Sequence, residues 1–375
     1  MEESVEVIGE GSFGCVHKPS LKCQDKNISY KNKVSKLLLS KNAKQELKEY
    51  TMISSVDRGR EFYLGKPTRC KLNPTPAALR AIKKCKNLTR KYFKNGVTKA
   101  KLDKMSLLIM NYGGVNLKSF ALSLLNLPRK YSNKSMVNEF WVESHRLFRG
   151  IFTFQKYRIL HHDIKPQNIV YHKLQNRVNY IDFGHMRNME KEMKMSYESN
   201  NWIYEYAYWN YPLEIQFLNR EEYYAFTTKS PSMRKEYFDV FIEDLNTFKN
   251  SKLAIAFDLF MEYACYNTSK KKIEETKRLY IYDFYKMLEK MSLDEYDIFL
   301  KRSIESIDVY GLGMSLQYVL MCCKHLMKPE TVKVMEECFF KMTCANLFER
   351  YDCSESIAHF ESILSNHFEV VFENH

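Results

Sequence analysis

The sequence predicts an α+β fold, with a small β-rich N-terminal part and a larger, mainly helical C-terminal part. Residues 8–16 combine glycines with strand-like neighbours, which favours a strand–turn–strand unit. Residues 138–159 and several segments after residue 230 carry apolar side chains at helical spacing. A chain of 375 residues can form one large two-lobed domain or two ordinary domains.

The composition is that of a globular protein, with 45% hydrophobic and 27% charged residues. No apolar run approaches the length of a membrane-spanning helix, and the first residues do not resemble a signal peptide. The ten cysteines contain no Cys-x-x-Cys pair. We therefore expect reduced thiols, no zinc site, and a cytoplasmic or other intracellular location.

The net charge of +13 is unevenly distributed. Between Lys66 and Lys104 lie thirteen basic residues and one acid, Asp103. Such a strip suits a polyanionic partner, whether nucleic acid, anionic lipid or an acidic protein. A solvated face that aids solubility is the simpler interpretation.

The glycine-rich stretch has the pattern G-x-G-x-x-G-x-V, which lets backbone N–H groups approach phosphates closely. A dinucleotide-binding turn would need a helix directly after the last glycine, whereas residues 15–19 indicate a strand and then a turn at Pro19. We expect a nucleotide-binding loop in which Val16 covers the adenine. It comprises Ile8, Gly9, Glu10, Gly11, Ser12, Phe13, Gly14, Cys15 and Val16.

A second motif runs from His161 to Asn168 and is followed by Asp182-Phe183-Gly184. Carboxylates, a lysine and an asparagine at these offsets suit phosphoryl transfer from Mg-ATP. Asp163 would accept the proton of the attacking hydroxyl, and Lys165 would neutralise charge on the transferred phosphate. Asn168 and Asp182 would hold Mg²⁺ or Mn²⁺.

In this order, the motifs resemble those of eukaryotic-type serine/threonine protein kinases, with a likeness to the kinases that large DNA viruses encode. The resemblance implies a bilobal protein-kinase-like fold, an N-lobe over residues 1–110 and a C-lobe over residues 111–375. The N-lobe would include the basic insertion 66–104, and the C-lobe a helical insert at about 215–303. The implied activity is transfer of the ATP γ-phosphate to hydroxyls of a protein substrate, in a host cell or virion if the chain is viral.

The resemblance also assigns residues to the nucleotide site. Lys36 would bind the α- and β-phosphates, with Lys33 as a competing candidate. The helix over about 42–56 would supply the paired carboxylate, for which we choose Glu49 over Glu46, one turn earlier.

The strand over residues 107–112 resembles the one that enters the hinge between kinase lobes. Met110 would then be the gatekeeper, and backbone groups around Tyr112 would bind the adenine. A core strand that ends at a Gly-Gly turn fits these residues equally well.

Further matches lie in the C-terminal part. The helix that starts near residue 306 would carry Asp308, whose carboxylate binds backbone amides of the catalytic loop, and Arg350 would pair with Glu214. His162 stands where kinases activated by phosphorylation carry arginine. We therefore expect activity without phosphorylation of the activation segment, residues 184–214. Packing would hold that segment in place through Trp202, Tyr206, Tyr208 and Trp209.

Three other functions compete with a protein kinase. A small-molecule kinase would share His-x-Asp and the metal-binding aspartate but would lack the equivalents of Asp308 and Arg350. A pseudokinase or scaffold fits poorly with intact Lys36, Asp163 and Asp182. A nucleic-acid-binding protein could use the basic strip without catalysis.

Overall fold

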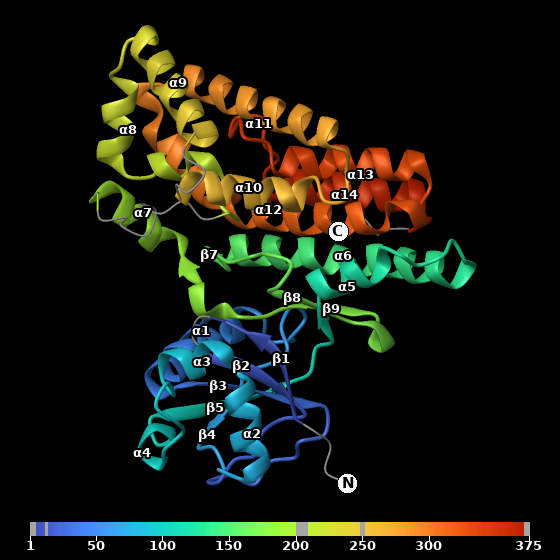
Figure 1. Ribbon diagram of the computed structural model, residues 1–375. Helices are drawn as coiled ribbons and strands as arrows, with labels where there is room; N and C mark the ends of the chain where they lie inside the picture. Colours follow the sequence, from blue (N-terminus) through green and yellow to red (C-terminus); the bar gives the residue numbers. More distant parts are fainter. Residues whose placement is uncertain (1–4, 12–13, 200–208, 248–251, 371–375) are drawn as a thin grey trace. The chain divides into compact units, whose positions relative to one another are not determined.

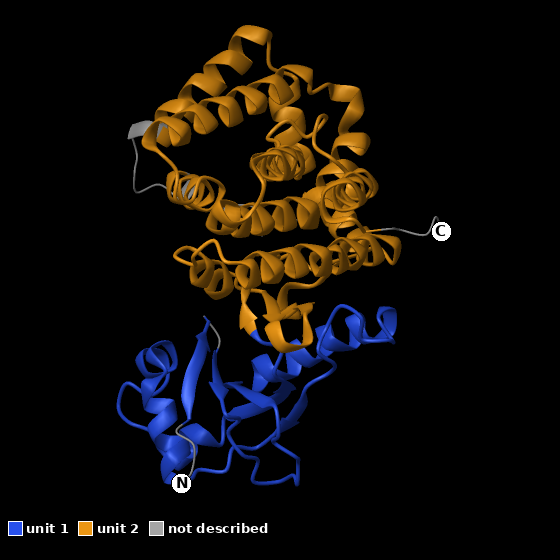
Figure 2. Cartoon of the chain, turned by 90° about the vertical axis from the view of Figure 1, so that its right-hand side faces the viewer, with its two compact units in different colours: residues 1–114 blue, residues 115–375 orange. Residues whose placement is uncertain are grey.

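The computed structural model describes residues 5–11, 14–199, 209–247 and 252–370. The chain divides into two compact units, unit 1 (Met1–Gly114) and unit 2 (Val115–His375), which Figure 2 colours separately. The α+β class predicted from the sequence is confirmed, because unit 1 contains an antiparallel sheet whereas helices dominate unit 2. None of the described helices is long and apolar enough to cross a membrane.

Unit 1 is organised around an antiparallel sheet with the strand order β1-β2-β3-β5-β4 (Figure 1). The continuous apolar run of β5 suits a strand with a neighbour on each side, and its first five residues are all buried. The described strands are β1 (Glu6–Glu10), β2 (Gly14–Lys18), β3 (Lys33–Leu39), β4 (Thr68–Cys70) and β5 (Met105–Asn111).

Four helices complete the described part of unit 1: α1 (Ser40–Val56), α2 (Pro76–Lys84), α3 (Lys86–Lys91) and α4 (Lys99–Leu102). The start of α2 is fixed by Pro76 in the first turn and by the Thr75 side chain, which accepts a hydrogen bond from the Ala78 amide. Apolar residues of α2 and α3 join the core beneath the sheet. The basic insertion is therefore a folded, helical part of unit 1.

Two disulfides cross-link strand β2 and the segment after it to this insertion. Cys15 is bonded to Cys85, and Cys23 is bonded to Cys70. The expectation of reduced thiols is therefore wrong for these four residues. Nothing in their spacing along the chain predicts the pairing, because the partners are brought together by contacts between distant segments: α3 packs against β2, and Cys23 bridges to Leu72 just after β4. The other six cysteines are free and buried, and all belong to unit 2.

Unit 2 is built mainly from helices. The described ones are α5 (Leu117–Leu124), α6 (Tyr131–Lys156), α7 (Met189–Tyr197), α8 (Arg220–Thr227), α9 (Pro231–Thr247), α10 (Lys252–Ala264), α11 (Lys270–Lys290), α12 (Tyr296–Cys323), α13 (Pro329–Met342) and α14 (Cys353–Phe368). The strands are β6 (Val115–Asn116), β8 (Ile169–His172) and β9 (Arg177–Tyr180), which form one sheet, and β7 (Ile159–Leu160) paired with β10 (Arg187–Asn188).

Helix α12 is the centre of unit 2. Nearly all its side chains from Ser303 to Cys323 are buried, because α5, α6, α10, α13 and α14 pack around it (Figure 1). The motif around Asp308 lies ten residues inside this helix, so the expectation that the helix starts near residue 306 is wrong. The helical character expected for the insert is confirmed by α9, α10 and α11.

Candidate functional site

The catalytic-loop candidates of unit 2 lie together at one end of the β8–β9 hairpin. The buried carboxylate of Asp163 accepts hydrogen bonds from Lys165 Nζ, at 2.8 Å to each oxygen. Asn168 Nδ2 donates to Asp163 Oδ2 at 2.7 Å and to the Asp163 carbonyl at 2.9 Å. The structure thus brings together three of the residues that the sequence motif singles out.

Asp182 reaches the same end of the hairpin from β9. Ile169 of β8 pairs with Tyr180 of β9, and the Ile181 amide donates to the Asn168 carbonyl at 3.0 Å. Asn168 therefore lies opposite Ile181, and Asp182 is the next residue along the chain. Asp182 has a left-handed backbone, with φ of 62°. The Asn168 amide nitrogen donates to Asp163, and the side-chain oxygen of Asn168 takes no part in these bonds. Side-chain oxygens of asparagine and aspartate suit Mg²⁺ or Mn²⁺.

Helix α12 contacts the backbone of the catalytic-loop candidate, residues 161–168. The Asp308 carboxylate accepts hydrogen bonds from the amides of His161 at 2.7 Å and His162 at 2.9 Å, which confirms the expected contact. Gly311 is required here because a Cβ would lie 2.5 Å from the Ile164 carbonyl oxygen. Burial raises the pKa of Asp308 to about 7, although the two backbone N–H donors oppose this shift.

The buried side chain of His162 contacts Tyr211, which follows Asp182-Phe183-Gly184 in the chain. Its Nδ1 lies 2.9 Å from Tyr211 Oη, and that hydroxyl donates to the His162 carbonyl at 2.8 Å. Because the hydroxyl hydrogen is used in this way, Nδ1 is the donor and carries the proton. Burial lowers the pKa of His162 to about 3, so the ring is neutral near pH 7.

The predicted pair of Arg350 and Glu214 is confirmed. Both side chains are fully buried, and Arg350 Nη2 lies 2.9 Å from Glu214 Oε2, with Nη1 bonded to the other carboxylate oxygen. Arg350 also donates to the Cys344 carbonyl and to Ser306 Oγ. This bidentate pair fixes the end of the segment 184–214 to the core of unit 2.

The insert contributes a contact that sequence reasoning missed. Tyr263 of α10 accepts a hydrogen bond at 2.6 Å from Gln167, which lies between Lys165 and Asn168, and its ring stacks on Trp209 with centroids 4.5 Å apart. Asn210, next to Trp209, donates to Asp163 Oδ1 at 3.3 Å. No local pattern reveals these contacts, because they join segments 96 and 47 residues apart.

The nucleotide-site candidates of unit 1 include one pair that differs from the sequence prediction. Lys36 of β3 pairs with Glu46 of α1, at 2.9 Å between Nζ and Oε2, whereas the prediction chose Glu49. The choice of Glu49 is therefore wrong: its carboxylate accepts a hydrogen bond from Gln45. The competing Lys33 is half-buried, and its ammonium group donates to the Asn111 side chain.

The glycine-rich loop connects β1 and β2, and its Ser12 and Phe13 lie outside the described residues. Gly14 is needed for close packing, because a Cβ there would lie 2.4 Å from the Leu37 carbonyl oxygen. Ile8, Gly9, Glu10 and Gly11 lie on β1 and the start of the loop, and Val16 lies on β2 within 3.6 Å of a Cβ built on Gly9.

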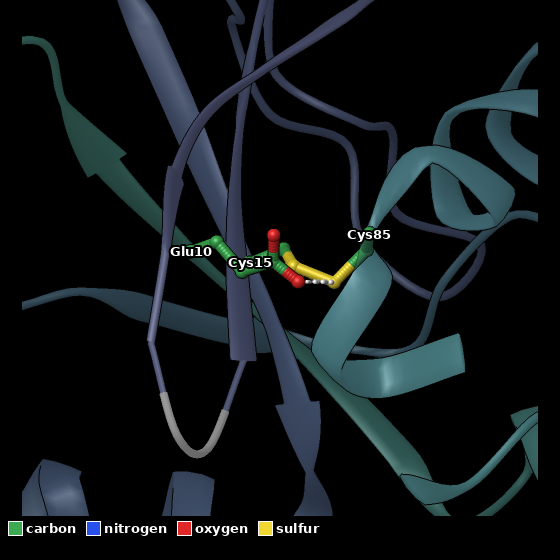
Figure 3. A group of neighbouring side chains, drawn as sticks. All are labelled: Glu10, Cys15 and Cys85. Atoms are coloured by element: carbon green, nitrogen blue, oxygen red, sulfur yellow. Dashed lines mark hydrogen bonds between the residues drawn. A yellow bond between two sulfur atoms is a disulfide. The ribbon is translucent and has the colours of Figure 1, made fainter. Parts of the chain in front are cut away.

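Cys15 and Glu10 have a structural role in unit 1 that the motif does not reveal. Figure 3 shows the Cys15–Cys85 disulfide beside the Glu10 carboxylate, whose Oε1 lies 3.8 Å from Cys85 Sγ and accepts a hydrogen bond from the Asn87 amide. These ligand atoms of Glu10, Cys15 and Cys85 lie within 4.8 Å of one another. Because both thiols are consumed in the disulfide, they cannot bind a metal ion as thiolates.

The hinge candidates lie at the end of β5. The Met110 sulfur lies 3.9 Å from the hydroxyl of Tyr50 on α1. The Tyr112 amide donates to the Asn32 carbonyl at 2.9 Å, and Lys18 Nζ lies 3.5 Å from the centroid of the Tyr112 ring. The Tyr112 N–H is therefore already bonded within unit 1.

The chain was also compared with known proteins. No protein-family model matches it, and no curated protein sequence does.

Proposed function

We propose that this protein is a serine/threonine protein kinase with a bilobal kinase fold, which transfers the γ-phosphate of ATP to protein hydroxyls. The observation that carries the proposal is the cluster of Asp163, Lys165 and Asn168 at the hairpin end that also carries Asp182. A general base, a cation and two oxygen ligands are what phosphoryl transfer uses.

Each residue has a role that follows from its surroundings. Asp163 accepts the proton of the substrate hydroxyl, and its orientation is set by Asn168 and Asn210. Lys165, now paired with Asp163, can turn its ammonium group to a phosphate oxygen as negative charge develops. In unit 1, the ion pair with Glu46 orients Lys36 for the α- and β-phosphates.

ATP supplies the phosphoryl group, and a divalent cation neutralises its phosphates. The oxygens of Asn168 and Asp182 fit such a cation, and the glycine-rich strands of unit 1 fit the phosphates. The contacts of Asp308 and the buried Glu214–Arg350 pair favour a protein kinase over a small-molecule kinase, which lacks this apparatus.

The test is an assay with labelled ATP, Mg²⁺ or Mn²⁺ and generic protein acceptors, with phosphorylated sites located by mass spectrometry. Asp163→Asn should still bind Mg-ATP but lose about 10²–10⁴-fold in turnover, because a positioned base is removed. Asp182→Asn should also weaken metal-dependent nucleotide binding. Asp294→Asn, at an exposed aspartate of unit 2, is the matched control and should behave as wild type. Wild-type turnover by Asp163→Asn would refute the proposal.

A further inference from the structure

The basic strip is displayed on helices whose opposite faces are fixed in the core of unit 1. On α2, Ala78, Ala81 and Ile82 are buried, and the cations Arg80, Lys83 and Lys84 are exposed. At 100° per residue, the three cations centre on the side of the helix opposite the three buried residues. Within the described part of the chain, none of these three cations is ion-paired.

Helix α3 repeats this arrangement after a single intervening residue, Cys85. Leu88 is buried, while Lys86 and Arg90 are exposed and lie one turn apart on the same face. The disulfide from Cys85 to Cys15 ties the junction between α2 and α3 to strand β2. The charged faces of both helices are therefore held in place before any partner binds.

The kinds of side chain exposed on this surface indicate which class of polyanion it can bind. Among residues 66–104, all of which the structure describes, no large apolar side chain is exposed. A membrane-binding surface buries apolar residues in lipid, and a protein interface has an apolar core with aromatic residues. Single-stranded nucleic acid is bound through exposed aromatic rings. The phosphates of a double helix need only cations at the surface.

We propose that the exposed faces of α2 and α3 bind the phosphate backbone of duplex nucleic acid, without reading its sequence. Most cations of the strip are lysines, which contact phosphates as point charges. The proposed binding surface belongs to unit 1 alone. The proposal does not depend on the kinase activity proposed above.

The test measures binding of the full chain to fluorescent 30-base-pair duplexes of DNA and RNA between 50 and 200 mM salt. With four or more phosphate contacts, affinity should fall at least about 100-fold over this range, since each contact releases counterions. Arg80→Gln/Lys83→Gln/Lys84→Gln should weaken binding at 50 mM salt at least tenfold and should reduce the logarithmic salt slope by about 2 to 3. Lys86→Gln/Arg90→Gln should likewise weaken binding and reduce the salt slope.

The affinities for DNA and RNA duplexes are expected to be similar. A strong preference for one of them would identify the source of the phosphates.

The matched control removes three exposed charges elsewhere, at the start of α11 in unit 2. Lys270→Gln/Lys271→Gln/Lys272→Gln lowers the net charge equally and should leave binding nearly unchanged. Phosphatidylserine vesicles and a single strand of the same length serve as competing ligands. The proposal is overturned if duplexes do not bind at 50 mM salt, if the control triple variant loses as much affinity, or if vesicles bind and duplexes do not.

Discussion

Helix phase decides which glutamate of α1 faces Lys36. The buried residues of this helix, Ala43, Glu46, Tyr50 and Ile53, follow one another at spacings of three, four and three, which is the inward stripe of an amphipathic helix. Glu49 lies outside this stripe, although it is only three residues from Glu46. The positions of Ala43, Tyr50 and Ile53 in the sequence already place Glu46, and not Glu49, on the buried face of this helix.

Glu46→Gln should therefore damage the proposed nucleotide site, because it leaves the largely buried ammonium group of Lys36 without its paired charge. We expect a loss of about 1–3 kcal/mol in stability and at least a tenfold fall in kcat/KM for ATP. Glu49→Gln is the matched control and should change stability by no more than about 0.5 kcal/mol. Chemical unfolding and steady-state kinetics measure both effects. If Glu49→Gln were the more damaging variant, the assignment of Glu46 would be wrong.

A second residue-scale prediction concerns phosphorylation of the activation segment. His162 is neutral and bonded to Tyr211, so it offers no cation to a phosphate. Ser196 is fully buried, and its hydroxyl donates to the Glu192 carbonyl, which makes it a poor phosphorylation site. Of the four aromatic residues expected to pack the segment, Trp209 stacks on Tyr263, and Trp202, Tyr206 and Tyr208 lie outside the described residues.

We expect full ATP turnover after phosphatase treatment, and also in Ser196→Ala/Ser199→Ala. The measurement is kinase activity before and after treatment, with the phosphorylation state determined by mass spectrometry. Loss of activity in both samples, with recovery of the treated wild type on rephosphorylation, would show that another cation binds a phosphate on this segment.

At the scale of elements, the two disulfides connect the same parts of unit 1. Each joins the segment 15–23 to the segment 70–85, across separations of 70 and 47 residues. Such cross-links restrict the unfolded chain and typically contribute about 2–4 kcal/mol each. They thereby stabilise the packing of α2 and α3 against β1 and β2, the strands on either side of the glycine-rich loop.

Thiol counting tests this pairing directly. Alkylation in denaturant without reductant should label six cysteines, and all ten after reduction. Cys85→Ser should leave the Cys15 thiol free to be alkylated and should raise amide hydrogen exchange in α2 and α3. In this variant a reductant should not increase the alkylation of Cys15 any further. Ten labelled cysteines in the unreduced wild type would disprove both cross-links.

The sequence predicts what depends on short spacing. Asp163, Lys165 and Asn168 lie within six residues, so their motif fixes their mutual placement, and the helices of the insert follow from local apolar periodicity. The Cys15–Cys85 bond and the Gln167–Tyr263 contact depend instead on packing between segments far apart in the chain. Local sequence patterns do not predict such contacts. The hydrogen bond between Gln167 and Tyr263 of the insert is therefore seen only in the structure.

For the molecule as a whole, buried titratable groups predict how stability depends on pH. In unit 2, burial lowers the pKa of His161 to about 4 and that of His162 to about 3. Below about pH 6.5 the unfolded chain binds two protons that the native state excludes, so stability falls as the pH falls. Asp308 acts oppositely, because its native pKa of about 7 lets the folded state bind a proton that the unfolded state releases above about pH 4.

The net effect of these three groups is a loss of about 3 kcal/mol between pH 7 and pH 4. All three tryptophans of the sequence (Trp141, Trp202 and Trp209) belong to unit 2, so tryptophan fluorescence during urea unfolding follows this unit alone. Asp308→Asn removes the group whose protonation stabilises the folded state at low pH. The free energy of unfolding of this variant should therefore fall more steeply with falling pH than that of the wild type. A stability that is constant from pH 7 to pH 4 would contradict the neutral state of the two histidines.

The Glu214–Arg350 pair also has a consequence for biosynthesis. Its two residues are 136 positions apart, and at about 5–20 residues per second the ribosome adds Arg350 about 7 to 27 s after Glu214. During this interval a carboxylate destined for the core has no partner, and unit 2 cannot complete its packing. Both cross-links of unit 1 involve only the first 85 residues. Unit 1 can therefore reach its native state on the ribosome while unit 2 is still being translated, and we expect nascent chains to fold in that order.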